Sequence, residues 1–282
     1  MRRLTFENNR GERIVFYRSP YIIESLTGIG EVDATIQGQT SPYQDGETYV
    51  DTRIQPRFPT MEGSITSTYL NEIKEHRKEI LRVCNPNLGL GKLILEMDGD
   101  LKEIPATLDN VPTFPERGDQ PYQRFMIIWK CPDPYWRDPL EVSRELKAYE
   151  GTFTFSFTFP TQFGIESDTT TLMNTGHTKA PVRIEVKGPI QRPLIENLTT
   201  GKHIQINAIV NPDQTLIIDT KPTNKRVLIK QGDETRNVMG WFDQAGDFWE
   251  LALGENEIRY RADAGVAEAV ATIRWQNKYV GV

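Results

Sequence analysis

The sequence has little of the chemistry from which most catalytic and metal sites are built. It contains two cysteines, Cys84 and Cys131, and three histidines, His76, His177 and His203. Without a Cys-x-x-Cys pair, two cysteines support no disulfide framework, so we expect both to be small buried apolar side chains in a reducing compartment. The histidines are far apart in sequence, and no second His or Cys completes a ligand pattern near His76. We therefore expect no zinc site.

Catalytic and nucleotide-binding motifs are missing as well. The sequence has no Gly-x-Ser-x-Gly elbow, and residues 89–92, Gly-Leu-Gly-Lys, lack the hydroxyl residue of a phosphate loop because Leu93 follows them. A glycosidase needs only two carboxylates at the right distance in space. The pairs that could serve are better explained as solvated surface charge. These candidates are Asp243 with Asp247 and Glu255 with Glu257. The residues show no visible active site and no cofactor motif, and on this ground alone the function stays open.

Long apolar runs and basic charge are also absent. No stretch approaches the roughly 18 apolar residues of a membrane-spanning helix. Polar residues 7–10, Glu-Asn-Asn-Arg, stand where a signal peptide needs an apolar region. The formal charge of −6 and the pI near 5.3 disfavour direct nucleic-acid binding. We expect a protein made in the cytosol, with no membrane insertion and no specific nucleic-acid binding.

A proline-rich connector divides the chain near its midpoint. Residues 131–140 read Cys-Pro-Asp-Pro-Tyr-Trp-Arg-Asp-Pro-Leu, and three prolines in ten residues exclude both a helix and a central strand. The sequence therefore predicts two domains, residues 1–140 and residues 141–282. Large aromatic side chains suit the packing of such a junction. The predicted junction residues are Pro132, Asp133, Pro134, Tyr135 and Trp136.

Two strands are expected on either side of this connector. Residues 123–130 form a short apolar run that predicts a buried strand. Residues 151–159 alternate Phe with Thr or Ser, which predicts a half-buried strand in another sheet.

One helix is expected in the first half, between about residues 68 and 84. Its apolar face would contain Tyr69, Ile73, Ile80, Leu81 and Cys84, and its charged residues would form a solvated face. We expect Ser67 or Thr68 to cap its start, Asn85-Pro86 to end it, and Glu75–Lys78 and Glu79–Arg82 to form ion pairs.

The rest of the first half reads as strands and one long polar segment. Residues 12–17 and 21–26 predict a hairpin or the start of a meander, and residues 92–97 and 101–107 predict a hairpin around Asp98-Gly99. Residues 38–59 are polar, with one extended piece at residues 48–54. Such a segment packs poorly alone, so a solvated functional loop and an inter-subunit arm are both open.

Short strands with regular turn residues fill the second half, which predicts an antiparallel β-sandwich. The expected strands are residues 181–187, 193–197, 202–209, 215–219, 227–230, 248–253, 257–260 and 269–279. Aromatic side chains gather between Trp241 and Trp249. On a sandwich, exposed aromatics can stack on sugars, so Trp241 and Trp249 are candidate sugar-stacking residues, although packing in the core is the preferred interpretation.

Scattered motifs along nearly the whole chain resemble one family. In the first half they are Leu81-Arg82-Val83-Cys84-Asn85-Pro86, Gly89, Gly91-Lys92-Leu93, Asp98-Gly99 and Cys131-Pro132-Asp133-Pro134-Tyr135-Trp136. In the second half they are Asn174-Thr175-Gly176, Ala180-Pro181, Gly188, Pro193, Asn197, Thr200-Gly201, Leu216-Ile217-Ile218-Asp219-Thr220, Leu251, Gly254-Glu255-Asn256-Glu257-Ile258 and Ile273-Arg274-Trp275. The chain resembles the distal tail (Dit) family of long-tailed, non-contractile bacteriophages.

The resemblance implies a structural protein of the phage tail tip, or baseplate hub, that is not an enzyme and holds no cofactor. Its first domain would be β-rich with one helix and would form a hexameric ring, and its second would be a galectin-like β-sandwich. The ring would join the tail tube to the tail-tip hub, pass DNA through its centre and serve host adsorption. The implied partners are the tail tube protein, the tail-tip hub protein, the tape measure protein and receptor-binding proteins. The implied location is the virion tail tip, after assembly in the host cytoplasm.

Two functions are in competition: a structural protein that forms a ring, and a protein that binds sugars. A closed ring needs head-to-tail contacts, for which the segment at residues 38–59 is the preferred candidate. The alternative function is a carbohydrate-binding host-recognition protein that uses the β-sandwich. Since the second half carries no large insertion, a docking platform is the preferred interpretation.

Overall fold

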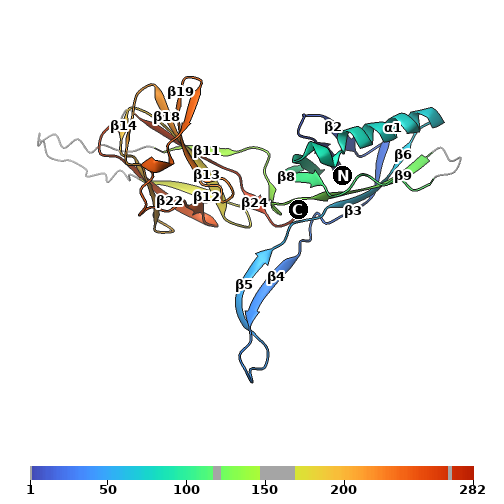
Figure 1. Ribbon diagram of the computed structural model, residues 1–282, viewed down its shortest axis with the longest axis horizontal. Helices are drawn as coiled ribbons and strands as arrows, with labels where there is room; N and C mark the ends of the chain where they lie inside the picture. Colours follow the sequence, from blue (N-terminus) through green and yellow to red (C-terminus); the bar gives the residue numbers. More distant parts are fainter. Residues whose placement is uncertain (1, 117–121, 147–168, 266–268) are drawn as a thin grey trace, which may run out of the picture. The chain divides into compact units, whose positions relative to one another are not determined.

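The computed structural model describes residues 2–116, 122–146, 169–265 and 269–282. The chain forms two compact units, Met1–Pro139 with Tyr279–Val282, and Leu140–Lys278 (Figure 1). The sequence-based division placed the last four residues in the second domain, whereas they lie in the first unit. The predicted strand at residues 151–159 lies outside the described residues.

An antiparallel sheet is the body of the first unit. Its strands follow the order β2-β1-β7-β8-β9-β6-β3, and the short β10 pairs with β8 and with β24. The bounds are β1 (Arg2–Glu7), β2 (Arg13–Phe16), β3 (Tyr21–Thr27), β6 (Thr60–Thr66), β7 (Gly91–Met97), β8 (Asp100–Leu108), β9 (Tyr122–Lys130), β10 (Trp136–Arg137) and β24 (Lys278–Tyr279). β9 confirms the buried strand predicted before the connector. Its alternate residues Phe125, Ile127 and Trp129 are buried in the core.

The first predicted hairpin is wrong and the second is confirmed. β2 pairs with β1, and β3 pairs with β6, so these two strands lie at opposite ends of the sheet path. The turn that joins β1 to β2 is held by the side chain of Asn8, which accepts hydrogen bonds from the N–H groups of Arg10 and Glu12. In contrast, β7 and β8 pair around Asp98 and Gly99, which both have positive φ, as a two-residue hairpin turn requires.

The predicted helix is present as α1 (Leu70–Val83), followed by a 3₁₀ turn η1 (Pro86–Leu88). Ile73, Ile80, Val83 and Cys84 are fully buried on its inner face. The placement of Tyr69 and Leu81 on that face was wrong: Tyr69 precedes the first helical residue and is 67% exposed, and Leu81 is 37% exposed.

The capping residues and ion pairs predicted for α1 are observed in part. The prediction that Ser67 or Thr68 caps α1 was wrong, because the N-cap is Tyr69 and no side chain caps it. The Ser67 hydroxyl accepts a hydrogen bond from the N–H of Tyr69, ahead of the helix. The Asn85 side chain, after the helix, caps η1. The predicted Lys78–Glu75 pair forms at 2.7 Å. Arg82 instead pairs with Glu12 across the unit.

The second unit is an antiparallel β-sandwich, as predicted. One sheet has the order β11-β23-β13-β18-β19-β20, with β21 on β13, and the other has the order β12-β22-β15-β16. Alternate residues of β13, from Val182 to Val186, point into a core that residues of both sheets fill. The mainly β architecture, with one α-helix among the described residues, confirms the predicted fold class.

The strand bounds of the second unit show where the sequence signal was weak. They are β11 (Val142–Leu146), β12 (Thr169–Asn174), β13 (Ala180–Lys187), β14 (Ile190–Gln191), β15 (Leu194–Asn197), β16 (Lys202–Gln205), β17 (Ile209–Val210), β18 (Gln214–Asp219), β19 (Arg226–Gln231), β20 (Glu234–Asn237), β21 (Glu250–Leu251), β22 (Gly254–Arg261) and β23 (Val270–Trp275), with a 3₁₀ turn η2 (Met239–Trp241). The predicted run at residues 202–209 divides into β16 and β17. The strands β11, β12, β14 and β20 had no predicted counterpart.

Candidate functional site: an exposed arm and its anchor

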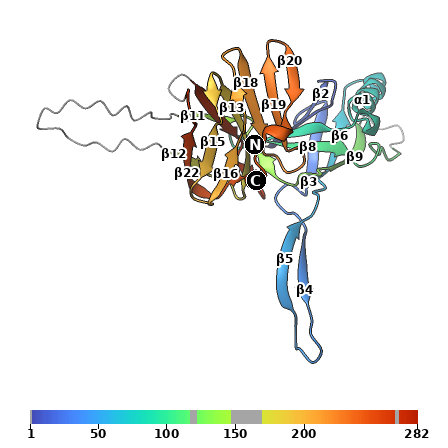
Figure 2. The same cartoon turned by 60° about the vertical axis from the view of Figure 1, so that its left-hand side comes forward.

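A two-stranded hairpin projects from the first unit (Figures 1 and 2). It consists of β4 (Ala34–Gln39) and β5 (Thr48–Ile54), which pair with each other and form a sheet of their own. We call residues 33–55 the arm. The predicted extended piece at residues 48–54 is β5, but β4 was missed because its sequence is mostly polar and contains Gly38. Every residue of β4 is exposed, and so is β5 as far as Arg53.

The tip of the arm presents a tyrosine in an unusual conformation. Pro42 and Tyr43 occupy the centre of a turn in which the N–H of Gln44 donates to the carbonyl of Ser41 at 3.1 Å. Tyr43 has φ +65°, a region that non-glycine residues rarely occupy, and its side chain is fully exposed. With Ile36, Tyr49 and Val50, which are each about 60% exposed, it gives the arm an apolar surface that the first unit does not cover.

Arg57 anchors the chain where it leaves the arm. Its side chain is 1% exposed, and within the described residues its guanidinium donates hydrogen bonds only to main-chain carbonyls. Nη1 donates to Gly28 at 3.2 Å, to Ile29 at 2.8 Å and to Glu31 at 2.8 Å; Nε donates to Pro134 at 3.0 Å, and Nη2 donates to Val280. Burial lowers the pKa of Arg57, and nearby Cys131 and Glu31 oppose that shift. Arg57 thus joins both ends of the arm, the connector and the C-terminal segment.

The segment that leads into the arm is also held in place, by close packing at Gly28 and by hydrogen bonds. Gly28 has φ +74°, and a Cβ there would lie 2.6 Å from the carbonyl oxygen of Phe58, so only glycine fits. The Gly28 N–H donates to the Glu31 carboxylate at 2.6 Å, which lowers the pKa of Glu31. At the base, the N–H of Gln55 donates to the carbonyl of Asp33 at 2.8 Å. The arm therefore leaves a rigid base.

The C-terminal segment Tyr279–Val282 packs into this same unit. The Tyr279 hydroxyl donates to Asp138 at 3.0 Å, and Lys102 lies 4.6 Å from the centre of the Tyr279 ring. Burial lowers the pKa of Lys102, but its hydrogen bonds to Asp100 and Asp138 outweigh burial and hold that pKa above its ordinary value. Gly281 lies so close to Gly30 that a Cβ would meet the Gly30 carbonyl oxygen at 2.5 Å.

The predicted junction residues lie next to this anchor. Trp136 is fully buried in the core of the first unit, and its indole N–H donates to the carbonyl of Ile29 at 2.9 Å. Asp133 forms an ion pair with Arg137 and accepts a hydrogen bond from the N–H of Tyr135. Tyr135 is half-buried. The structure thus gives Trp136 a role in the first core, and the junction role of residues 132–136 stays a prediction.

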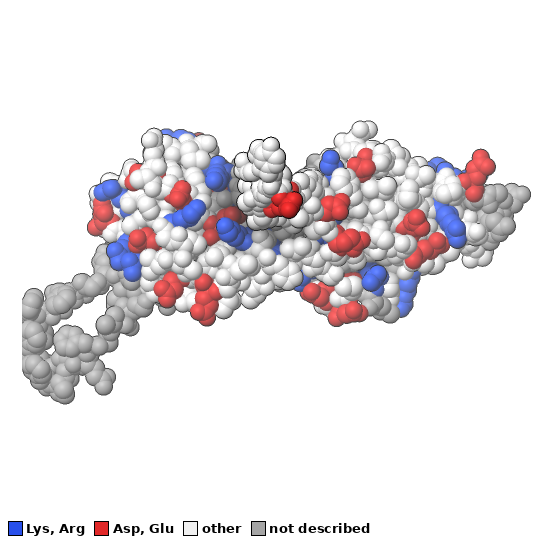
Figure 3. All heavy atoms as spheres, turned by 90° about the horizontal axis from the view of Figure 1, so that it is seen from below, with Lys and Arg blue, Asp and Glu red and all other residues white. Residues whose placement is uncertain are grey.

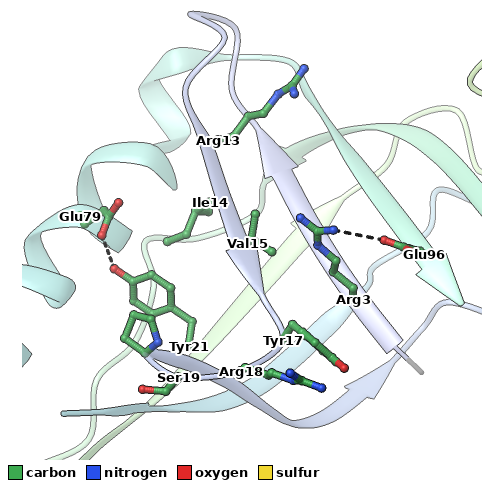
Figure 4. Close-up of a pocket in the computed structure, with 11 residues that line it drawn as sticks. Arg3, Arg13, Ile14, Val15, Tyr17, Arg18, Ser19, Tyr21, Glu79 and Glu96 are labelled. Atoms are coloured by element: carbon green, nitrogen blue, oxygen red, sulfur yellow. Dashed lines mark hydrogen bonds and ion pairs between the residues drawn. The ribbon is translucent and has the colours of Figure 1, made fainter. Parts of the chain in front are cut away.

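A pocket of 590 Å³ opens beside β1 and β2 of the same unit (Figure 4). Three arginines, Arg3, Arg13 and Arg18, line it together with Tyr17, Val15 and other residues. Tyr21 lines the pocket, and its hydroxyl donates to Glu79. Burial and that carboxylate raise the pKa of Tyr21, so the hydroxyl keeps its proton.

The sugar-stacking candidates of the second unit differ in exposure. Trp249 is 1% exposed and donates from its indole N–H to the carbonyl of Ile195 at 3.3 Å. Its ring is part of the core, which contradicts a stacking role. Trp241 is half-buried against the same core, with Arg236 placed 6.0 Å from its ring centre. Phe242 and Phe248 stack on each other at 4.5 Å.

The described part of the chain holds no group of three or more His, Cys, Asp or Glu side chains that could bind a metal ion. Cys84 and Cys131 are both buried free thiols, as predicted. Glu255 and Glu257, one of the two carboxylate pairs considered from the sequence, lie on the exposed face of β22. None of the helices in the described ranges is long and apolar enough to span a membrane.

Comparisons with known proteins agree on one kind of structure. Residues 173–279 match the family model described as siphovirus-type tail component, C-terminal domain. The crystal structure of the Dit protein of phage SPP1, described as a paradigm of the hub adsorption apparatus in phages that infect Gram-positive bacteria, matches with a TM-score of 0.70 at 10% identity. That match covers 99% of each chain.

Chains of the phage P2 baseplate in its activated conformation match as well. With calcium the TM-score is 0.58 and with strontium it is 0.57, each at 11% identity over the full length of both chains. A search of curated proteins by sequence finds no match. The resemblance to the distal tail family, which the sequence motifs indicated, is confirmed by the family match and by the fold.

Proposed function

We propose that the protein is a structural, non-enzymatic part of a phage tail tip, because residues 173–279 match the model of the siphovirus-type tail component family. In this proposal the first unit of six copies forms a ring, and the ring joins the tail tube to the tail-tip hub. The observation that carries the proposal is the arm: an exposed hairpin with an uncovered apolar surface on a rigidly anchored base. A hairpin of this kind gains stability by packing on another molecule.

The ring contact follows from the arm's position on the chain. One copy offers its arm to a different surface of the next copy, which is a head-to-tail contact, and such contacts form a ring when the rotation from copy to copy closes. The anchor at Arg57 supports this role, because a contact made at the far end of the arm fixes the neighbouring copy only if the base of the arm is rigid.

The remaining functions depend on this ring. Its open centre would pass DNA, and the acidic composition, with a formal charge of −6, would keep the lumen from adhering to DNA. Along the tail axis the ring would contact the tail tube, tape measure and tail-tip hub proteins. The β-sandwich would be the platform for receptor-binding proteins. Assembly would take place in the host cytoplasm, and the mature location would be the virion.

Electron microscopy of the purified full chain, alone and with its tail-tip partner, tests the ring. Classified particles with sixfold symmetry and an open centre are the expected result. Single copies under both conditions would contradict the proposal.

Replacing the arm tests its role separately. Because Asp33 and Gln55 already form a hydrogen bond at the base, residues 34–54 can be replaced by Asn-Gly, which suits a tight turn. We expect a protein that unfolds at nearly the same temperature as the parent and no longer forms rings. Rings that survive the replacement would show that the contact lies elsewhere.

A further inference from the structure

The arm and the pocket beside β1 and β2 carry opposite charge. Residues 31–52 contain five acidic residues and no Lys or Arg. The first twenty residues contain five arginines and two glutamates, and three of these arginines line the pocket. We propose that the acidic tip of the arm, with Tyr43, docks into the arginine-lined pocket of a second copy of this chain. This inference rests on the proposed ring and names its acceptor surface.

Arg18 is the cation of the pocket best suited to bind an external carboxylate. Arg3 faces Glu96 at 3.4 Å, and Arg13 faces Glu7 at 2.6 Å. In the part of the chain that the structure describes, Arg18 has no carboxylate partner, and its guanidinium lies 4.9 Å from the centre of the Tyr17 ring. Figure 4 shows these side chains around the opening, with the Arg3–Glu96 pair marked.

The acidic groups of the pocket are already engaged. Glu96 pairs with Arg3, and Glu79 accepts the hydrogen bond of Tyr21. Arg3 offsets the charge of Glu96, whereas Glu79 keeps its charge beside Tyr21. The lining holds three arginines against two glutamates, so the arginine side of the opening can meet an acidic ligand. Val15, which lines the same wall and is 36% exposed, adds an apolar surface for an aromatic ring.

The arm tip offers groups that match this opening. Asp45 and Glu47 flank Gly46 on the exposed loop, and the Tyr43 ring stands free of the arm. Figure 3 views the molecule from the side to which the arm points. A strand advances about 3.3 Å per residue, so the tip lies roughly 30 Å from the base of the arm. An arm of that length reaches a neighbouring copy, and the contact joins two different surfaces, as a closed ring requires.

Disulfide trapping tests the contact directly. Tyr43→Cys and Val15→Cys in one chain place a thiol on each side, while the native Cys84 and Cys131 are buried. On oxidation we expect covalent multimers up to the full ring on a non-reducing gel. The control pairs Tyr43→Cys with Val111→Cys, since Val111 is 59% exposed and does not line the pocket. This control should give no multimers above the level of single-cysteine variants.

Charge reversal tests the electrostatic part. Arg18→Glu and Asp45→Arg should each weaken assembly about tenfold or more in the dissociation constant, and the double variant should recover most of that loss. Arg10→Glu is the matched control, because Arg10 is an exposed arginine of the same region outside the pocket. Assembly of the parent should also weaken with salt. Sedimentation velocity measures all of these.

The outcomes separate this inference from the proposed ring. If the parent forms sixfold rings, but the variant that combines Tyr43→Cys with Val15→Cys does not cross-link and Arg18→Glu assembles like Arg10→Glu, the docking site is wrong and the ring stands. If the parent stays a single copy with and without its partner, both fail. Equal unfolding temperatures of the charge variants exclude a loss of fold as the cause.

Discussion

Two hairpins of the first unit have the same backbone pattern and opposite environments. In β7 and β8, Leu93, Leu95 and Ile104 are buried, and a two-residue turn joins strands that continue a large sheet. In β4 and β5 no side chain is buried, the joining loop is longer, and a bulge interrupts the pairing at Gln37 and Gly38. Main-chain hydrogen bonds are common to both hairpins. Burial of side chains is therefore what makes β7 and β8 part of the core and leaves β4 and β5 exposed to solvent.

Because the arm has no buried side chains in its strands, other contacts must hold it in place. A lone two-stranded hairpin is marginally stable in water. The stability of the arm's position therefore comes from its base, where Arg57, Gly28 and Glu31 fix the two chain ends, and from whatever surface covers its apolar side chains. Perturbing the base, the buried hairpin and the arm should give effects of decreasing size.

The largest effect is expected at the base. Arg57→Met removes the donors of a buried network and leaves its carbonyl partners without hydrogen bonds, which should cost about 3–5 kcal/mol of unfolding free energy. Urea denaturation measures the change. The control is Arg53→Met on the arm, whose side chain is 68% exposed and which should change stability by less than about 0.5 kcal/mol. Similar values for the two variants would contradict the anchoring role of Arg57.

The next effect separates the two hairpins. Leu93→Ala in β7 should cost about 2–5 kcal/mol, because it removes methyl groups from a filled core. Val50→Ala in β5 should change the stability of the single copy by less than about 0.5 kcal/mol, because Val50 is 59% exposed. Thermal unfolding at low protein concentration gives both values. A large loss from Val50→Ala would mean that the arm packs on its own unit.

The smallest effect at neutral pH concerns the thiols of the sheet body, whose contribution changes only in alkaline solution. Burial raises the pKa of Cys131 to about 12, and burial also raises the pKa of Cys84. A thiol that ionises more easily when unfolded keeps its full stabilising contribution below the unfolded pKa, near 9, and loses it as the pH rises towards 12. Each thiol should then lower stability by up to about 1.4 kcal/mol per pH unit in that window. Cys131→Ala should flatten the alkaline loss seen by urea denaturation; an unchanged slope would contradict the burial of Cys131.

Local signals in the sequence predicted the parts of the fold that depend on near neighbours. The Asp98-Gly99 turn, the apolar face around Ile73 and Ile80, and the alternation in β13 each follow from turn chemistry or from periods of two or 3.6 residues. Tyr69 was misplaced because spacing alone does not show where a helix begins.

The anchor could not be predicted in the same way. Arg57 binds carbonyls of residues 28, 134 and 280, and nothing in the sequence shows that these segments meet. The acceptor pocket was missed for the same reason, since Arg3 and Arg18 come together only when β1 and β2 pair and the chain turns towards β3. The sequence has no Lys or Arg between Ser19 and Thr52, and the five acidic residues from Glu31 to Asp51 within that stretch were the one signal that marked the arm as a charged surface.

The return of Tyr279–Val282 to the first unit makes the second unit an insertion in the topological sense. Truncating the chain after residue 139 would remove β24 and the Val280 carbonyl, and it would leave one donor of Arg57 without its acceptor. The first unit should instead be isolated as a circular permutant, or by excising Leu140–Lys278 and bridging Pro139 to Tyr279. For the same reason, one proteolytic cut within the second unit gives two fragments that each keep a segment of the first unit, the N-terminal fragment Met1–Pro139 and the C-terminal fragment Tyr279–Val282.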